Sequence, residues 1–284
     1  TLLCRVTGYV REKALFSVIG AGHLYDMYRT ANRIPNAFRG LFAEGALHAA
    51  FVPALAQLTG EDDASRREAR ELVRGLLAVM LLAVGLVVAV GILGSPWLVR
   101  LYALGFEATP GKLETTVLMN RLMFPYLLLI SLAALLQGVL NSHERFLLSA
   151  STPILFNLTL AAAAWWAVPR YPEPELVLSL AVLVGGLLQF VVQAPAVRRL
   201  GYSLRPAWRS FWTPQVRGVL LLMLPGIPVL GINQINQLVS NRFASFLESG
   251  VSYTYGAYRV TELVFGSIVV QLTTVLLPVL SREL

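Results

Sequence analysis

Six long runs of this sequence contain no charged residue, and these runs constrain the fold more than any other feature. Each has about the 20 residues that an α-helix needs to cross the hydrocarbon core of a bilayer. They cover residues 75–99, 122–143, 146–169, 176–197, 218–241 and 263–281. One or two such runs occur by chance in a soluble helical protein, whereas six at this spacing predict an all-α polytopic membrane protein.

The composition agrees with a membrane protein. Only 14% of the 284 residues are charged and 56% are hydrophobic, with a mean hydropathy of +0.65. An ordinary soluble domain carries about 25% charged residues. The low charge content therefore excludes most soluble classes.

Two further segments, residues 1–21 and 23–58, are apolar but carry charges on one side. We expect both to be spans that line a cavity, which brings the predicted total to about eight. Asp26, Arg29 and Arg33 lie at positions i, i+3 and i+7 and so share one helical face.

Prolines are expected to interrupt two of the spans. Pro35 lies in the second span, and Pro225 and Pro228 lie in the seventh. A broken transmembrane helix is tolerated where its freed backbone groups line a cavity. We therefore expect Asn36 to lie beside a helix break.

The first fifty residues concentrate charge in an otherwise apolar chain. A charge at the bilayer centre costs about 2.5–3.5 kcal/mol, so such groups face a bundle interior, a partner or a ligand. Five of the nine are arginines, whose planar fork of donors suits phosphate oxygens. The nine are Arg5, Arg11, Glu12, Lys13, Asp26, Arg29, Arg33, Arg39 and Glu44.

Basic residues of the connecting loops predict the orientation. Only Arg100, Lys112 and Arg170 fall on one side of the predicted membrane. By the positive-inside rule the other side is cytoplasmic, so the loops after helices 2, 4, 6 and 8 are cytoplasmic. The net charge of +7 then requires no nucleic acid as partner. The cytoplasmic set is Arg66, Arg67, Arg70, Arg74, Arg145, Arg198, Arg199, Arg205, Arg209, Arg217 and Arg282.

The sequence predicts no metal and no cofactor. Cys4 is the only cysteine, so it forms no disulfide framework or cysteine-based metal site within these residues. His23, His48 and His143 lack the spacing of metal ligands. The chain begins inside a predicted helix without a signal-peptide pattern, so we expect a fragment of a longer protein.

Dense sequence motifs occupy residues 33–39, 41–46 and 50–53. These motifs resemble those of the MurJ (MviN) flippase family. Shorter matches, such as Phe124-Pro125-Tyr126 and Leu276-Leu277-Pro278, extend the resemblance over essentially the whole chain. Exporters of the same superfamily share the helix pattern but not the two most specific segments. The densest matches are Arg33-Ile34-Pro35-Asn36-Ala37-Phe38-Arg39, Leu41-Phe42-Ala43-Glu44-Gly45-Ala46 and Ala50-Phe51-Val52-Pro53.

This resemblance implies a transporter, not an enzyme, that moves lipid II from the cytoplasmic to the periplasmic leaflet of the inner membrane. The family fold has about fourteen helices in two lobes around a cationic cavity. Residues 1–200 would form the first lobe, 201–216 a basic amphipathic cytoplasmic loop, and 217–284 the first two helices of the second lobe. The partners implied are lipid II, the bilayer and the cell-wall synthesis machinery.

The resemblance also implies the site residues. The substrate-binding residues are Arg5, Arg11, Arg39, Arg259 and Asn36, and the gating or ion-pair partners are Glu12, Asp26 and Glu44. Several arginines that converge on a pyrophosphate would replace its lost hydration with charge-assisted bonds. The acidic residues would hold these arginines in the empty cavity.

Structural roles remain open for each of these residues. Arg5, Arg39 and Arg259 alternatively form interhelical ion pairs. Arg11 and Glu12 alternatively form a gate or pair across the lobes. Asp26 is either a periplasmic gate or a local partner of Arg29, three residues on. Arg29 and Arg33 alternatively pair locally or snorkel. Glu44 alternatively lies in a buried packing pair.

Alternating access between the two lobes is the expected mechanism. One alternative is an exporter of another lipid-linked oligosaccharide or of an amphipathic drug. Another is a membrane-embedded polyprenyl-phosphate transferase, which needs paired acidic residues. The paired acids here, Glu61, Asp62 and Asp63, fit a solvated loop better, and the chain has no Walker A motif. A scaffold role leaves the embedded arginines unexplained.

Overall fold

The computed structural model describes residues 2–42, 46–58, 62–208 and 211–264, and every described regular element is a helix. Glu44 and most of the run 263–281 lie outside these ranges. In the first half the helices are α1 (Leu2–Ile19), α2 (His23–Phe42), α3 (Ala46–Gln57), α4 (Asp63–Leu93), α5 (Ser95–Tyr102), the 3-10 helix η1 (Leu104–Ala108) and α6 (Lys112–Met123).

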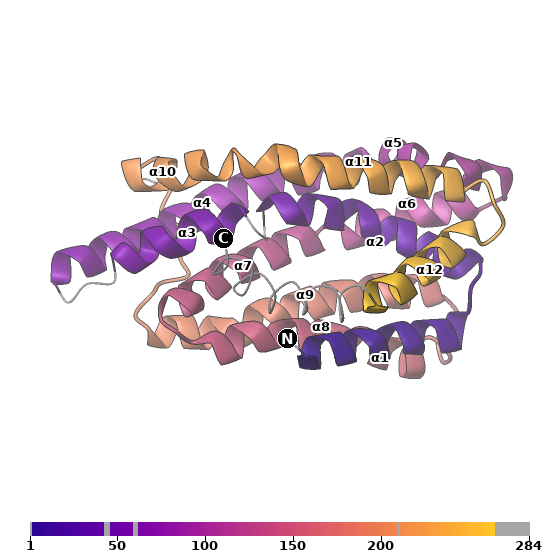
Figure 1. The fold of residues 1–284 in the computed structure, drawn as a ribbon, viewed down its shortest axis with the longest axis horizontal. Coiled ribbons are helices and arrows are strands. Elements are labelled where there is room, and N and C mark those ends of the chain that lie inside the picture. The colour runs from indigo at the N-terminus through magenta and orange to yellow at the C-terminus, as the bar shows by residue number, and fades with distance from the viewer. Residues whose placement is uncertain (1, 43–45, 59–61, 209–210, 265–284) are drawn as a thin grey trace, which may run out of the picture.

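The second half continues with α7 (Tyr126–Ser142), α8 (Phe146–Ala162), the π-helical turn η2 (Ala163–Ala167), α9 (Pro174–Arg199), α10 (Pro214–Met223), α11 (Gly226–Ala244) and α12 (Gly250–Val264). Most of the long helices run near the long axis of the molecule, whereas α12 crosses obliquely (Figure 1). The predicted all-α fold is confirmed.

Four described helical segments are long and apolar enough to cross a membrane: Asp63–Leu93, Lys112–Ser142, Phe146–Ala167 and Pro174–Arg199. Most of each of four charge-free runs lies within one of these segments. The shortest has 22 residues, which is about 33 Å at 1.5 Å per residue and matches a hydrocarbon core of about 30 Å. Large apolar side chains such as Leu86 and Leu93 of α4 point outward, as expected for a surface that faces lipid.

The run 218–241 is not one helix. It is divided between α10 and α11 at Leu224 and Pro225, which confirms the expected interruption by Pro225. Pro228 does not break α11, because it is the third residue of that helix. The N–H groups of the first turn have no partner within the helix, so proline costs little there.

Pro35 does not break α2, and this prediction was wrong. The helix runs without interruption from His23 to Phe42. Proline lacks the N–H that would donate to the carbonyl four residues earlier, which is the carbonyl of Ala31. Asn120 of α6 donates its Nδ2 to this oxygen at 2.8 Å. A side chain from another helix thus replaces the missing donor and keeps α2 continuous.

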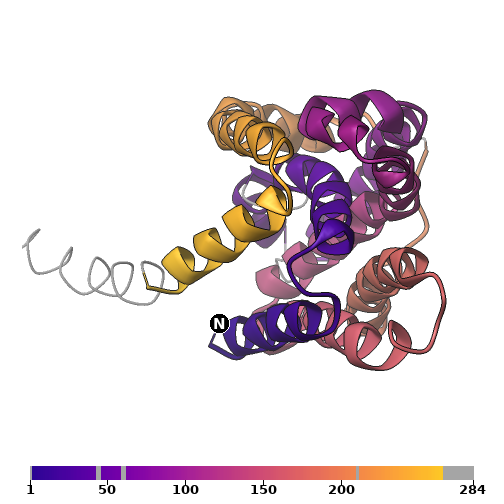
Figure 2. The same cartoon turned by 90° about the vertical axis from the view of Figure 1, so that its right-hand side faces the viewer.

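The helices α7, α8 and α9 form a packed layer that also contacts α1, and α2 lies against α6 and α7. Seen from one end, α12 lies between α11 and α1 (Figure 2). Helices α1 and α2 therefore pack on the layer of α7, α8 and α9, and α12 contacts α2.

We predict that Asn120→Ala destabilises the full-length protein. The Ala31 carbonyl, which is buried beside Pro35, would lose its donor, and an unpaired buried carbonyl costs about 1–3 kcal/mol. Thermal unfolding in detergent would measure the loss. The double variant Asn120→Ala/Pro35→Ala is the control, because the substituted alanine supplies the N–H that Pro35 lacks. Failure of the double variant to recover stability would contradict this account of α2.

Candidate functional site

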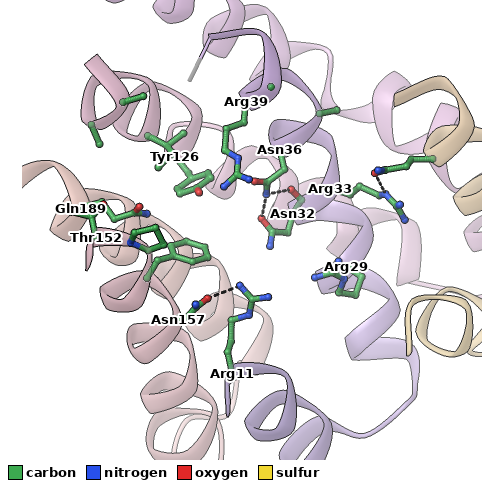
Figure 3. A pocket seen from close by; sticks show the side chains of 18 of the residues that line it. Arg11, Arg29, Asn32, Arg33, Asn36, Arg39, Tyr126, Thr152, Asn157 and Gln189 are labelled. Carbon is green, nitrogen blue, oxygen red and sulfur yellow. Dashed lines mark hydrogen bonds between the residues drawn. The ribbon is translucent and has the colours of Figure 1, made fainter. Parts of the chain in front are cut away.

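A cavity of about 560 Å³ lies between α2, α11 and α12 on one side and α7, α8 and α9 on the other. Figure 3 shows Arg39 and Arg33 on the α2 side, with Tyr126, Thr152 and Gln189 opposite. No aspartate or glutamate is among the described residues that line it. The lining contains five arginines: Arg11, Arg29, Arg33, Arg39 and Arg259.

Uncharged amides complete much of the polar lining. Asn36 donates its Nδ2 to the Asn32 carbonyl at 2.7 Å and to Asn32 Oδ1 at 2.6 Å. Asn36 therefore lies on an intact helix that faces the cavity, not beside a helix break. The other lining amides are Gln137, Asn157, Gln189, Gln193, Gln234 and Gln237.

Apart from Asn36, sequence reasoning missed these amides as site residues. A usable signal was present, because Asn32 with Asn36 and Gln189 with Gln193 are polar pairs at i, i+4 in apolar surroundings. Gln234 and Gln237 have the i, i+3 spacing. Either spacing puts both side chains on one helical face.

Glu12 lies at the centre of a buried network between α1, α2 and α12. Its side chain is paired with the guanidinium of Arg11, and only 7% of the residue is exposed. Tyr25 donates to Glu12 Oε2 at 2.9 Å and Tyr255 donates to Oε1 at 3.0 Å. The carboxylate thus has several donors, which a buried charge requires.

Arg11 and Arg259 join this network to the cavity. Arg11 donates its Nη1 to Asn157 Oδ1 at 2.9 Å. Arg259 donates its Nε to Tyr255 Oη at 2.7 Å, and its Nη2 lies 3.7 Å from Glu12 Oε1. One carboxylate therefore faces two arginines, one from α1 and one from α12.

Arg29 and Arg33 line the cavity, although neither was selected as a site residue from the sequence. The Arg29 guanidinium lies over the ring of Tyr255, 3.3 Å from its centroid. Arg33 donates its Nε to Gln237 Oε1 at 3.1 Å. The alternative of local pairing or snorkelling does not hold, because Arg29 contacts Tyr255 of α12 and Arg33 contacts Gln237 of α11.

Arg5 is placed differently from the other predicted arginines. It does not line the cavity but lies in a neighbouring groove of about 860 Å³ between α1 and α12. Arg11 and Arg259 line both spaces. Phe16 and Val260 contribute to the apolar part of the groove.

Asp26 holds three helices together at the end of the bundle away from the cavity. Its Oδ2 accepts a bond from Lys112 Nζ of α6 at 2.8 Å. Its Oδ1 accepts bonds from the backbone N–H and the hydroxyl of Ser252 of α12, at 2.8 and 2.5 Å. The partner is Lys112, so the alternative pairing with Arg29 was wrong. Asp26 is fully buried and Lys112 is 6% exposed, so Lys112 is not a loop residue.

Further polar contacts close the same end. Asn241 of α11 donates to Thr30 Oγ1 at 3.3 Å and to the Tyr102 carbonyl at 3.0 Å. The Gly105 N–H donates to Ser245 Oγ at 3.0 Å. A Cβ at Gly105 would lie 2.3 Å from the Ser245 carbonyl oxygen, so only glycine allows this approach. We call this set of contacts the closed end.

The described residues contain no group of three or more histidine, cysteine or acidic side chains placed to hold a metal ion. The polar chemistry of the cavity is therefore that of arginines and amides, which favours an anionic ligand with uncharged hydrogen-bonding groups.

Comparison with known proteins identifies the family. A family model described as "Lipid II flippase MurJ" matches residues 15–284. The chain is 35% identical over its whole length to the "Probable lipid II flippase MurJ" of Vibrio cholerae and covers 55% of that protein. It is 37% identical to the "Lipid II flippase MurJ" of Burkholderia cenocepacia, with 99% of this chain and 55% of that protein covered.

A solved structure described as "Lipid II flippase MurJ, inward closed conformation" has the same fold. The TM-score is 0.80 at 23% sequence identity, and the match covers all of this chain and 58% of that one. This chain spans about half the length of the curated relatives that it matches. The family consists of transporters, not enzymes, and its members are multi-pass proteins of the bacterial inner membrane. The chain belongs to the MurJ family of lipid II flippases.

Proposed function

We propose that this chain forms the first lobe, and the start of the second, of a transporter that moves lipid II from the cytoplasmic to the periplasmic leaflet. The observation that carries this proposal is the lining of the cavity. Five arginines face one space whose described lining has no carboxylate. Such a space attracts a multiply charged anion.

A pyrophosphate diester fits this space chemically. It brings about two negative charges that leave water, and guanidinium groups offer short, often bidentate bonds to phosphate oxygens. Arginines from α1, α2 and α12 line the same space, so the anion would join both lobes. Arg11, Arg39 and Arg259 are the proposed main contacts, with Arg29 and Arg33 beside them.

Partners that already hold the arginines make an empty cavity tolerable. Arg11 and Arg259 share Glu12, and Arg29 lies over the ring of Tyr255. A cation–π contact stabilises the charged guanidinium without placing a carboxylate beside it. Because these partners compensate the arginines only in part, an incoming pyrophosphate still gains from binding.

The groove between α1 and α12 suits the lipid part of the same molecule. It shares Arg11 and Arg259 with the cavity and continues past Phe16 and Val260. A polyprenyl chain could lie there while the headgroup enters the cavity. In this arrangement Arg5, which lines the groove, would meet the phosphate nearest the lipid.

The orientation follows from the basic loops. The positive-inside rule puts the loops after the second, fourth, sixth and eighth spans in the cytoplasm, so the closed end is periplasmic. The cavity would then receive substrate from the cytoplasmic side. Alternating access requires the closed end to open while the lobes rock.

A second transport function remains as the alternative, namely export of another undecaprenyl-linked glycan. The same pyrophosphate chemistry would serve both substrates. A chain that delivers such a precursor would also be expected to meet the enzymes of cell-wall synthesis on the periplasmic side.

We predict that Arg39→Ala in the full-length protein abolishes growth of a bacterium depleted of its own lipid II flippase. Loss of one charge-assisted contact, at about 1.5–3 kcal/mol, lowers transport by roughly 10- to 100-fold. Arg39→Lys should recover only part of the activity, because lysine keeps the charge but not the fork of donors.

Arg100→Ala is the matched control, since Arg100 pairs with Glu107 on the exposed surface away from the cavity. It should support normal growth. Membrane levels of every variant are compared by immunoblotting. If well-expressed Arg39→Ala supported full growth, Arg39 would not belong to the substrate site. If the unaltered protein failed to support growth, another lipid-linked glycan would be the favoured substrate.

We also predict that Asp26→Asn shifts the protein toward a state with the closed end open. The change leaves Lys112 buried without its anion, and breaking a buried ion pair costs about 3–5 kcal/mol. Spin labels at the exposed positions Leu118 and Tyr253, in a Cys4→Ser background, report the separation of α6 and α12. The distance distribution should move to longer values.

Glu107→Gln provides the control for this experiment. It removes an ion pair of 3.0 Å whose two side chains are about half exposed, and such pairs contribute little. Its distance distribution should match that of the unaltered protein. Identical distributions for Asp26→Asn and the unaltered protein would mean that Asp26 does not hold the closed end.

A further inference from the structure

The two sides of the cavity differ in charge. All five arginines come from α1, α2 and α12, whereas none of the described lining residues from α7, α8 and α9 is charged. We call this uncharged side the amide wall. It consists of Tyr126, Gln137, Thr152, Phe156, Gln189 and Gln193.

Two aromatic rings form part of the amide wall. Tyr126 and Phe156 have ring centroids 5.3 Å apart. Both rings pack on a glycine pair of α9, because a Cβ at Gly186 would lie 2.6 Å from Tyr126 Cδ2 and one at Gly185 would lie 2.7 Å from Phe156 Cδ2. Any larger residue at either position would displace a ring. The glycines thus determine where the aromatic surface lies.

Gln193 leaves a hydrogen-bond acceptor unused at this wall. It is 1% exposed, and its Nε2 donates to the carbonyls of Gln189 and Ala133 at 2.8 and 3.3 Å. Its Oε1 has no donor among the described residues. Buried acceptors are seldom left unpaired, so this atom needs a donor that the described residues do not supply.

We propose that the amide wall binds the sugar that adjoins the pyrophosphate of the substrate. This inference rests on the proposed function. Sugar hydroxyls and acetamido groups donate and accept hydrogen bonds as glutamine side chains do, and Phe156, which is 9% exposed, adds a small apolar surface to the cavity lining. The arginines opposite would hold the phosphates, so one cavity recognises both parts of the headgroup.

A charged peptide fits the amide wall less well than a sugar. Its carboxylates and amines would lie against a surface that offers no opposite charge, and an unpaired charge away from water is costly. The wall therefore gives specificity for a glycosylated pyrophosphate over a bare one. A site built to hydrogen-bond a group discriminates strongly against the analogue that lacks it.

The test compares two ligands with full-length protein in nanodiscs. One ligand is undecaprenyl pyrophosphate, and the other is the same molecule with one N-acetylhexosamine attached. The unaltered protein should bind the glycosylated ligand about tenfold more tightly, which corresponds to one or two neutral hydrogen bonds. Gln189→Met and Gln137→Met should each remove most of this difference. Affinity for the bare pyrophosphate should stay within about twofold.

Methionine keeps the length of glutamine without its hydrogen bonds, and Gln137 is only half-buried, so that variant tests the proposal without a large change in the core. Gln215→Met on the exposed side of α10 is the matched control and should leave both affinities unchanged. Arg39→Ala should lower the affinity for both ligands by the same factor.

The outcomes separate the two proposals. If the unaltered protein binds neither ligand, the proposed function fails. If it binds both equally, or if the folded methionine variants keep the tenfold preference, the sugar site is wrong while the pyrophosphate site stands. If Gln137→Met weakened the binding of both ligands equally, the sugar site would also be wrong, because the amide wall would then have a general structural role.

Discussion

Charge held away from water must be paired, and this constraint determines how the first two helices are built. Arg11, Glu12, Asp26 and Arg29 all lie within spans that otherwise pack apolar side chains. Each carboxylate is surrounded by donors from other helices, so the ionic contacts also fix which helices are neighbours. A helix that lost its partner charge would carry an uncompensated ion into the bundle, at a cost of several kcal/mol.

The two buried carboxylates solve this problem in different ways. Asp26 has a dedicated cation, Lys112, and two donors from Ser252, which gives it a complete shell. Glu12 instead is shared between Arg11 and Arg259, whose guanidinium side chains are 13% and 35% exposed. The first arrangement suits a structural closure, and the second leaves arginine donors available to a ligand.

The sequence alone predicted features that depend on local pattern. Charge-free runs identified the apolar spans, and the placement of arginines in residues 1–50 indicated a cationic interior. Contacts between residues distant in the chain were not predictable in this way. Lys112 looked like a loop cation because its partner Asp26 is 86 residues earlier. Pro35 looked like a helix breaker because the donor that replaces its N–H belongs to Asn120. The amides of α9 were missed, although Gln189 and Gln193 have the i, i+4 spacing, because each is a single polar interruption of an apolar run.

The nature of the contacts at the closed end bears on how α11 and α12 could move away from the helices that precede them. Asn241 and Ser245 make neutral hydrogen bonds to α2, to Tyr102 and to Gly105, and water can replace such bonds at little net cost. Ser252 donates to the Asp26 carboxylate, so its two bonds are charge-assisted and stronger. The Asp26–Lys112 pair joins α2 to α6, so it need not break if α11 and α12 move away. An anion in the cavity would act away from the closed end, because it would draw the arginines of α1, α2 and α12 together. Closure of the cavity around the ligand would then accompany release of the hydrogen bonds at the closed end, in a single rocking motion. The charge of a bound anion would shift the equilibrium toward the state in which the cavity is closed.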